Sequence, residues 1–255
     1  MLIVLAEGSS REISFKICIS PDRLFRCKLI LSRVTIGRFL EELMFKTPYI
    51  KLFAIAIITF SLCLANISIA KEPVSKILVF GDSLVAGYEL SLDDAFPAVL
   101  QKKLKKEGFD FEVINAGVSG DTTSGGLTRL EWTLEMKPDY IILELGANDM
   151  LRGINPKVTR FNLEKMLKII KQKEIPVLLA GMKSAPNLGS AFKGEYEGVF
   201  KELAEKYNAV YYPFFLEGVI NKRDLMQDDG LHPNKEGVKV MVHNIFDSVN
   251  RLLER

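Results

Sequence analysis

A serine, a histidine and an aspartate occupy positions in this sequence from which they could act as a nucleophile and its activating base. Ser83 follows a short apolar run, so we expect its hydroxyl at the end of a buried strand. A serine hydroxyl is a weak nucleophile until a base takes its proton, and the imidazole of His232 can be that base. Asp229 lies close enough in the chain to reach the Nδ1 atom of His232 and to fix its tautomer. These residues predict acyl transfer through a covalent intermediate.

The same chemistry requires hydrogen-bond donors for the negative charge of the tetrahedral intermediate. The backbone N–H groups of Ser83 and Gly120 can supply two donors, and the side-chain amide of Asn148 can supply a third. Gly120 suits this role because it has no side chain to block the approach of a substrate. We therefore expect these three residues to form an oxyanion hole.

Each of these segments also has an ordinary structural interpretation, because glycine, aspartate, asparagine and serine are common turn residues. Asp82 is expected to hold the loop of Ser83 rather than to act as a base. Asp228 is the alternative to Asp229 as the partner of the histidine. His243 lies in an expected helix and is interpreted as a surface or packing residue. The catalytic interpretation is favoured by the combination of segments and by their order along the chain.

Alternating apolar runs and amphipathic segments after residue 71 predict the elements that would position these residues. The expected strands are residues 76–80, 111–115, 140–145, 176–180 and 209–212. The expected helices are residues 94–106, 124–136, 159–173, 190–206 and 235–253. Strand alternating with helix predicts an α/β fold, a three-layer α/β/α sandwich around a parallel sheet. The segments 81–87, 117–123, 146–149 and 228–233 would then meet at the carboxyl edge of the sheet, where ligands bind.

Composition excludes several other classes of protein. Of the 255 residues, 48% are hydrophobic and 26% are charged, which excludes a disordered chain and a multi-span membrane protein. The 34 basic and 32 acidic residues give a net charge of +2, so we expect no nucleic-acid partner. The chain has 2 histidines, and its 3 cysteines all precede residue 71, so we expect no metal site in the catalytic part.

Residues 44–70 have the layout of a secretory signal peptide. Lys46 and Lys51 form a basic start, an uncharged apolar run follows, and Ser68 and Ala70 are the small residues of a cleavage site. We therefore expect a periplasmic or secreted protein that contacts a membrane only through this segment. The alternative is an uncleaved membrane anchor.

Residues 1–43 fit no recognisable pattern and are interpreted as a disordered or non-native extension upstream of a start at Met44. Residues 71–255 form the expected catalytic domain. The sequence leaves its oligomeric state open.

The catalytic segments resemble the signature blocks of the SGNH hydrolases, also called GDSL esterases and lipases. The matching residues are Gly81-Asp82-Ser83, Gly120, Gly146-Ala147-Asn148-Asp149 and Asp229-Gly230-Leu231-His232. The resemblance covers residues 75–255 and is greatest to the bacterial thioesterase I, lysophospholipase and arylesterase branch. It implies a Ser83–His232–Asp229 triad, the oxyanion hole described above, and a flavodoxin-like five-stranded sheet. Ala147 departs from the family pattern, in which many members have a second glycine.

The expected function is that of a serine esterase acting on aryl esters, acyl thioesters or lysophospholipids, without a cofactor. The alternatives are a carbohydrate O-deacetylase on the same fold and an inactive ligand-binding module. The loops 150–156 and 182–189 are expected to border an apolar acyl site. Their candidate substrate-binding residues are Met150, Leu151, Ile154, Met182, Pro186 and Leu188.

Overall fold

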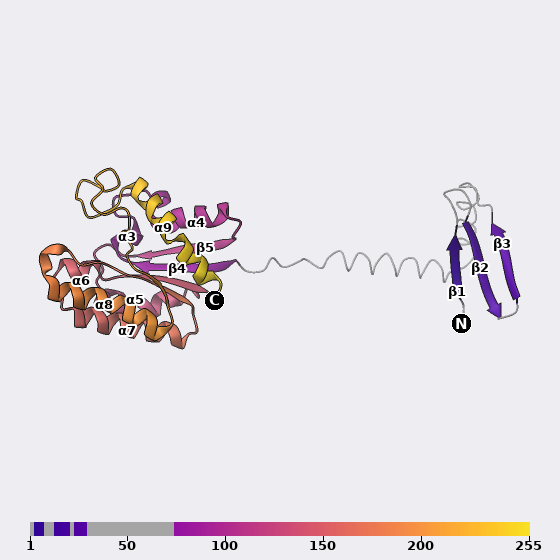
Figure 1. Cartoon of the computed structure of the whole chain (residues 1–255), viewed down its shortest axis with the longest axis horizontal. Helices are drawn as coiled ribbons and strands as arrows, with labels where there is room; N and C mark the ends of the chain where they lie inside the picture. The colour runs from indigo at the N-terminus through magenta and orange to yellow at the C-terminus, as the bar shows by residue number, and fades with distance from the viewer. Residues whose placement is uncertain (1–2, 8–12, 21–22, 30–73) are drawn as a thin grey trace. The chain divides into compact units, whose positions relative to one another are not determined.

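The computed structural model describes residues 3–7, 13–20, 23–29 and 74–255 (Figure 1). The chain divides into two units, Met1–Lys71 and Glu72–Arg255. In the first unit, strands β1 (Ile3–Glu7), β2 (Ile13–Ser20) and β3 (Arg23–Leu29) form an antiparallel sheet in that order. The expected signal peptide, residues 44–70, lies outside the described residues. The interpretation of residues 1–43 as an extension stays a prediction.

The second unit is built on the five-stranded parallel sheet that the sequence predicts. Its strands are β4 (Ser75–Gly81), β5 (Phe111–Gly117), β6 (Tyr140–Glu144), β7 (Val177–Ala180) and β8 (Val210–Tyr212). Their order across the sheet is β5-β4-β6-β7-β8, with all neighbours parallel. This is the flavodoxin-like order, so the expected fold is confirmed.

Helices cover both faces of the sheet (Figure 1). One layer contains α4 (Phe96–Lys106) and α9 (Lys235–Leu253). The other contains α5 (Thr123–Leu134), α7 (Pro156–Gln172) and α8 (Ser190–Tyr207). Within the described part of the chain, no helix combines the length and apolar character that crossing a membrane requires.

Four short elements were not predicted: α3 (Ser83–Ala86), α6 (Ala147–Leu151) and the 3₁₀ turns η1 (Leu92–Asp94) and η2 (Pro186–Leu188). Each is about one turn long, so it produces no repeating apolar pattern that a sequence could show. Both α3 and α6 directly follow strands and carry candidate site residues.

The core lies on both sides of the central strands. In β4, Ile77, Leu78, Val79 and Phe80 are completely buried, because helices pack on both faces of this strand. β5 is only partly buried, since it forms the edge of the sheet. Burial is therefore complete in the central strand β4 and partial at this edge.

The order of the strands creates a topological switch point at the carboxyl ends of β4 and β6. The chain leaves β4 toward the layer of α4, whereas it leaves β6 toward the layer of α7. The loops after these two adjacent strands therefore diverge, and ligands bind at such a switch point. Ser83 follows β4 and Asn148 follows β6, so the two residues flank this switch point.

Leu78→Ala should lower the free energy of unfolding by about 2–5 kcal/mol, because it leaves a cavity in the fully buried centre of β4. Leu92→Ala is the matched control: the Leu92 side chain is 82% exposed, and its truncation should cost less than about 0.5 kcal/mol. Urea denaturation followed by circular dichroism measures both. Equal destabilisation by the two substitutions would contradict the burial described for β4.

Candidate active site

Ser83 is the first residue of the one-turn helix α3, immediately beyond β4. Asp82 caps this helix, since its Oδ1 accepts the backbone N–H of Leu84 at 3.0 Å. The end of β5 packs directly against α3: a Cβ at Gly117 would lie 2.3 Å from the backbone N of Ala86. The turn that carries Ser83 is therefore held by the Asp82 cap and by the packing of β5 against it.

The structure brings Ser83, His232 and Asp229 together. The Oγ of Ser83 lies 2.9 Å from Nε2 of His232, and Nδ1 of His232 lies 2.6 Å from Oδ2 of Asp229. Both distances are within hydrogen-bonding range, so the imidazole connects the hydroxyl to the carboxylate. The three side chains have the geometry of a nucleophile, a base and the carboxylate that orients the base.

The loop before α9 fixes the carboxylate of Asp229. Its Oδ1 accepts the backbone N–H groups of Leu231 and His232 at 2.8 and 3.0 Å. Partial burial acts to raise the pKa of Asp229, but the hydrogen bonds from His232 and Leu231 outweigh it and lower this pKa to about 2. Asp229 therefore stays ionised at neutral pH. Asp228, the alternative partner, lies exposed next to it.

Two further contacts hold His232 in place. The ring of Tyr88 lies beside the imidazole, with the ring centroids 4.5 Å apart. The backbone N–H of Gln227 donates to the carbonyl of His232 at 2.8 Å. The side-chain amide of Gln227 donates to the carbonyl of Tyr88, also at 2.8 Å. Gln227 thus joins the histidine loop to the segment after α3. His243, in contrast, is exposed on α9, as expected.

The side-chain amide of Asn148 is oriented by Asp82. Its Nδ2 donates to Oδ2 of Asp82 at 3.1 Å. A carboxylate can only accept, so this contact sets which end of the amide carries the nitrogen. The second N–H of the same group then has a fixed direction and can serve as a donor beside Ser83.

Gly120 stands in a turn that a glycine accommodates without strain, since its φ is +81°. Arg152, which follows α6, donates through Nη2 to the carbonyl of Gly120 at 2.7 Å. The loop after β5 is thereby tied to the segment that carries Asn148. The candidate oxyanion donors Gly120 and Asn148 are therefore held by neighbouring parts of the structure.

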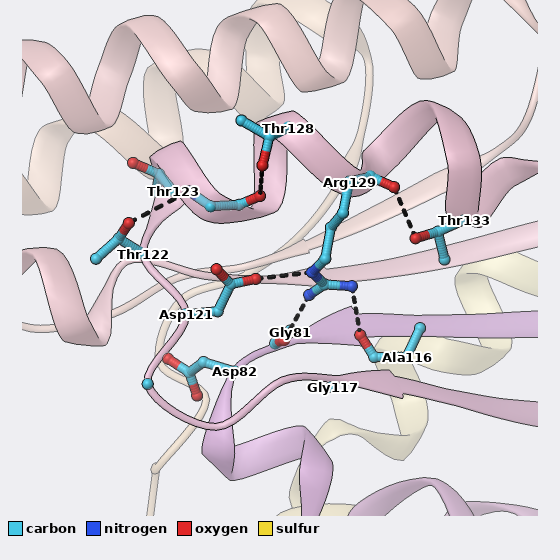
Figure 2. A network of polar contacts seen from close by, with 12 residues as sticks. Gly81, Asp82, Ala116, Gly117, Asp121, Thr122, Thr123, Thr128, Arg129 and Thr133 are labelled. Atoms are coloured by element: carbon cyan, nitrogen blue, oxygen red, sulfur yellow. Dashed lines mark hydrogen bonds and ion pairs between the residues drawn. The ribbon is translucent and has the colours of Figure 1, made fainter.

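Arg129 is a positioning residue that the sequence analysis missed. From α5 its guanidinium donates to Oδ2 of Asp121 at 2.7 Å and to the carbonyls of Ala116 and Gly81 at 2.9 Å each (Figure 2). It also lies over the ring of Phe80, 3.8 Å from the centroid. One side chain thus connects the carboxyl ends of β4 and β5 with the loop of Gly120. No sequence motif marks it, because two of its three partners are backbone carbonyls.

Asp149 is a second group whose role the sequence did not reveal. This buried carboxylate accepts the backbone N–H and the hydroxyl of Thr123 at 2.8 and 2.5 Å, and the hydroxyl of Thr159 at 3.1 Å. It binds the start of α5 and the first turns of α7 to α6. Asp149 therefore fixes the short helix in which its neighbour Asn148 lies.

The candidate acyl-site residues differ in their access to solvent. Met150 and Met182 are 9% and 4% exposed and belong to the hydrophobic core. Leu151 and Pro186 are exposed, and Ile154 and Leu188 are partly exposed. These last four side chains are the ones that could contact an acyl chain directly.

Arg129→Lys should lower the free energy of unfolding by about 1–3 kcal/mol, because an ammonium group cannot replace a planar fork that binds one carboxylate and two carbonyls. Arg160→Lys is the control, since its exposed pair with Glu202 contributes at most about 1 kcal/mol. Urea denaturation of both variants tests this expectation. An Arg129 variant as stable as the control would show that the network does not hold the strand ends.

Comparison with known proteins places this geometry in a family. The sequence profile of the GDSL-like lipase/acylhydrolase family matches residues 79–240. An arylesterase of Vibrio mimicus is 43% identical over 175 residues, which cover 68% of this chain and 86% of that protein. Thioesterase 1/protease 1/lysophospholipase L1 of Escherichia coli K12 is 37% identical over 161 residues, covering 63% of this chain and 76% of that protein.

A solved structure supports the same assignment. The psychrotrophic esterase EstA from Pseudoalteromonas, inhibited by monoethylphosphonate, matches with a TM-score of 0.67 and 35% identity. The match covers 71% of this chain and 100% of EstA. This chain belongs to the GDSL-like lipase/acylhydrolase family and is a carboxylic ester hydrolase.

Proposed function

We propose that Ser83, His232 and Asp229 are the catalytic triad of this hydrolase. The observation that supports the assignment is the pair of hydrogen bonds from Ser83 Oγ to His232 Nε2 and from His232 Nδ1 to Asp229 Oδ2. We further propose that the backbone N–H groups of Ser83 and Gly120 and the amide of Asn148 form the oxyanion hole. In these roles Ser83, His232 and the oxyanion donors touch the reacting atoms, whereas Asp229 acts through the imidazole of His232.

The reaction proceeds in two acyl-transfer steps. Ser83 Oγ attacks the carbonyl carbon of an ester or thioester while His232 Nε2 takes the hydroxyl proton. Asp229 stabilises the imidazolium that forms, and the oxyanion donors bind the negative oxygen. His232 then gives its proton to the departing alcohol or thiol as the carbon–heteroatom bond breaks. Water hydrolyses the acyl-serine by the same route and restores the serine hydroxyl.

The substrates we propose are aryl esters, acyl thioesters and lysophospholipids. The names of the relatives, an arylesterase and a thioesterase and lysophospholipase, support this range. An acyl chain could contact the apolar side chains that reach solvent, which are Leu151, Ile154, Pro186 and Leu188. Met150 and Met182 are buried in the core, so we propose that they contribute to packing rather than to direct contact. The other candidate is carbohydrate O-deacetylation, which would show as a strong preference for acetyl groups.

Export of the enzyme is a separate proposal. It rests on the basic start, apolar run and small residues between positions 44 and 70. The substrates would then be esters of the cell envelope or its surroundings. Cleavage gives a periplasmic or secreted enzyme, whereas retention of the segment gives a membrane-anchored one.

Ser83→Ala should abolish hydrolysis of p-nitrophenyl esters, because no other group in the proposed site supplies the nucleophile. Ser248→Ala is the control: it removes a buried hydroxyl in α9 that contacts Arg251 and should leave kcat unchanged. A series of acyl lengths run with the wild type separates the substrate classes. Activity retained by Ser83→Ala would move the nucleophile elsewhere, and a preference for acetyl over all longer chains would favour the deacetylase.

Asn148→Ala should lower kcat by about 10²–10³, since it removes one donor from the oxyanion hole. KM should change little, and the free energy of unfolding should fall by about 1–3 kcal/mol, because the buried Asp82 loses one donor. Asn244→Ala, which removes an exposed amide that donates to the carbonyl of Glu217, should retain the wild-type kcat. Steady-state kinetics and urea denaturation of both variants distinguish catalysis from folding. Loss of folded protein in proportion to the loss of activity would contradict the proposed role of Asn148.

A further inference from the structure

Two carboxyl groups lie in contact beneath the proposed oxyanion hole. Asp82 ends the turn after β4, and Glu144 is the last residue of the adjacent strand β6; neither has any exposed surface. The backbone N–H of Asp82 donates to Oε2 of Glu144 at 3.2 Å. The two carboxyl groups also lie close enough that each alters the pKa of the other. A hydrogen bond between the two carboxyl groups would require a proton on one of them, because an ionised carboxylate can only accept.

The donors around the pair are divided unequally. Asp82 accepts the backbone N–H of Leu84 on Oδ1 and the amide of Asn148 on Oδ2. Glu144 accepts the backbone N–H of Asp82 on Oε2, but no N–H or hydroxyl donor reaches its Oε1. Hydrogen bonds from donors stabilise an ionised carboxylate. The arrangement therefore favours the charge on Asp82 and the proton on Glu144.

The surroundings give little compensation for a second negative charge. Besides each other, the titratable groups that interact electrostatically with the pair are Tyr196 of α8 and His232. Arg129 donates to the carbonyl of Gly81, but its charge is paired with Asp121. Burial first, and then the charge of Asp82, raise the pKa of Glu144 well above its usual range. Burial also raises the pKa of Asp82, to about 6.

We propose that Glu144 is a positioning residue which, as a neutral carboxylic acid, donates a hydrogen bond to the Asp82 carboxylate and thereby holds the Asn148 amide toward the oxyanion hole. The inference rests on the proposed role of Asn148. Each link is a contact between buried or partly buried groups, from β6 through the turn after β4 to α6. Without the proton, two adjacent carboxylates would repel each other and disturb the acceptor that fixes Asn148.

The proposal gives a defined pH dependence. The pKa of Glu144 is higher in the folded protein than in the unfolded chain, so folding retains this proton. The stabilisation that the proton provides is complete at low pH and is lost as the pH rises through the folded pKa of Glu144. Both stability and kcat should therefore decline on the alkaline side.

Glu144→Gln should preserve the function of this link, because an amide N–H can donate to Asp82 while the amide oxygen accepts its backbone N–H. At neutral pH we expect kcat within about threefold of the wild type and loss of the alkaline decline that Glu144 causes. Glu144→Ala removes the donor and should lower kcat about 10- to 100-fold with little change in KM. This loss is smaller than the loss expected for Asn148→Ala, because the oxyanion donor itself remains. Glu164→Gln, the same chemical change on the surface of α7, should alter neither kcat nor its pH profile.

Infrared spectroscopy tests the protonation state without catalysis. The wild type at neutral pH should show a carbonyl stretch of a buried protonated carboxylic acid that Glu144→Gln removes and Glu164→Gln retains. Absence of such a band, or a folded Glu144→Gln variant as impaired as Glu144→Ala, would overturn the proposal. If Glu144→Ala fails to fold, the glutamine variant and the spectrum still decide it. Retained activity in Ser83→Ala would instead refute the proposed function and leave the spectroscopic result unaffected.

Discussion

The buried carboxyl group of Asp82 is the interaction on which the arrangement of the site depends. It caps the helix that begins at Ser83, accepts the amide of Asn148 and contacts Glu144, so it joins the ends of two central strands. Burial of a charge is unfavourable unless hydrogen bonds compensate for it. Here the compensating donors come from groups that the proposed chemistry needs in fixed positions. The requirement to satisfy one buried charge therefore also orders the site.

The parallel sheet accounts for the convergence of segments that are distant in the sequence. The strand order reverses between β4 and β6, and the loops after β4, β5 and β6 supply Ser83, Gly120 and Asn148 around this switch point. His232 enters from the loop before α9. Arg129 and Asp149 keep these segments in register through contacts that do not touch a substrate in the proposed mechanism.

Much of this could be predicted from the sequence, because buried parallel strands and amphipathic helices leave periodic patterns. The triad candidates were also recognisable, since Ser83 follows the first predicted strand of the sheet, and Asp229 and His232 lie together just before the last predicted helix. Arg129 could not be recognised, because its partners are mainly backbone carbonyls that no sequence motif identifies. Glu144 did leave a signal, a single charged residue within an otherwise apolar strand. The burial of Met150 and Met182 depends on how short loops fold back on the core, which an apolar residue type alone does not reveal.

The close packing of Gly117 against Ala86 has a consequence for evolution and for protein engineering. Since no side chain fits between β5 and the turn of Ser83, that turn cannot move without displacing the strand beside it. Variation in substrate preference must then arise elsewhere, in the segments around Leu151 and Pro186, which are exposed. Libraries that vary Leu151 and Pro186 but keep Asn148 and Arg152 could diversify selectivity without changing the proposed catalytic residues.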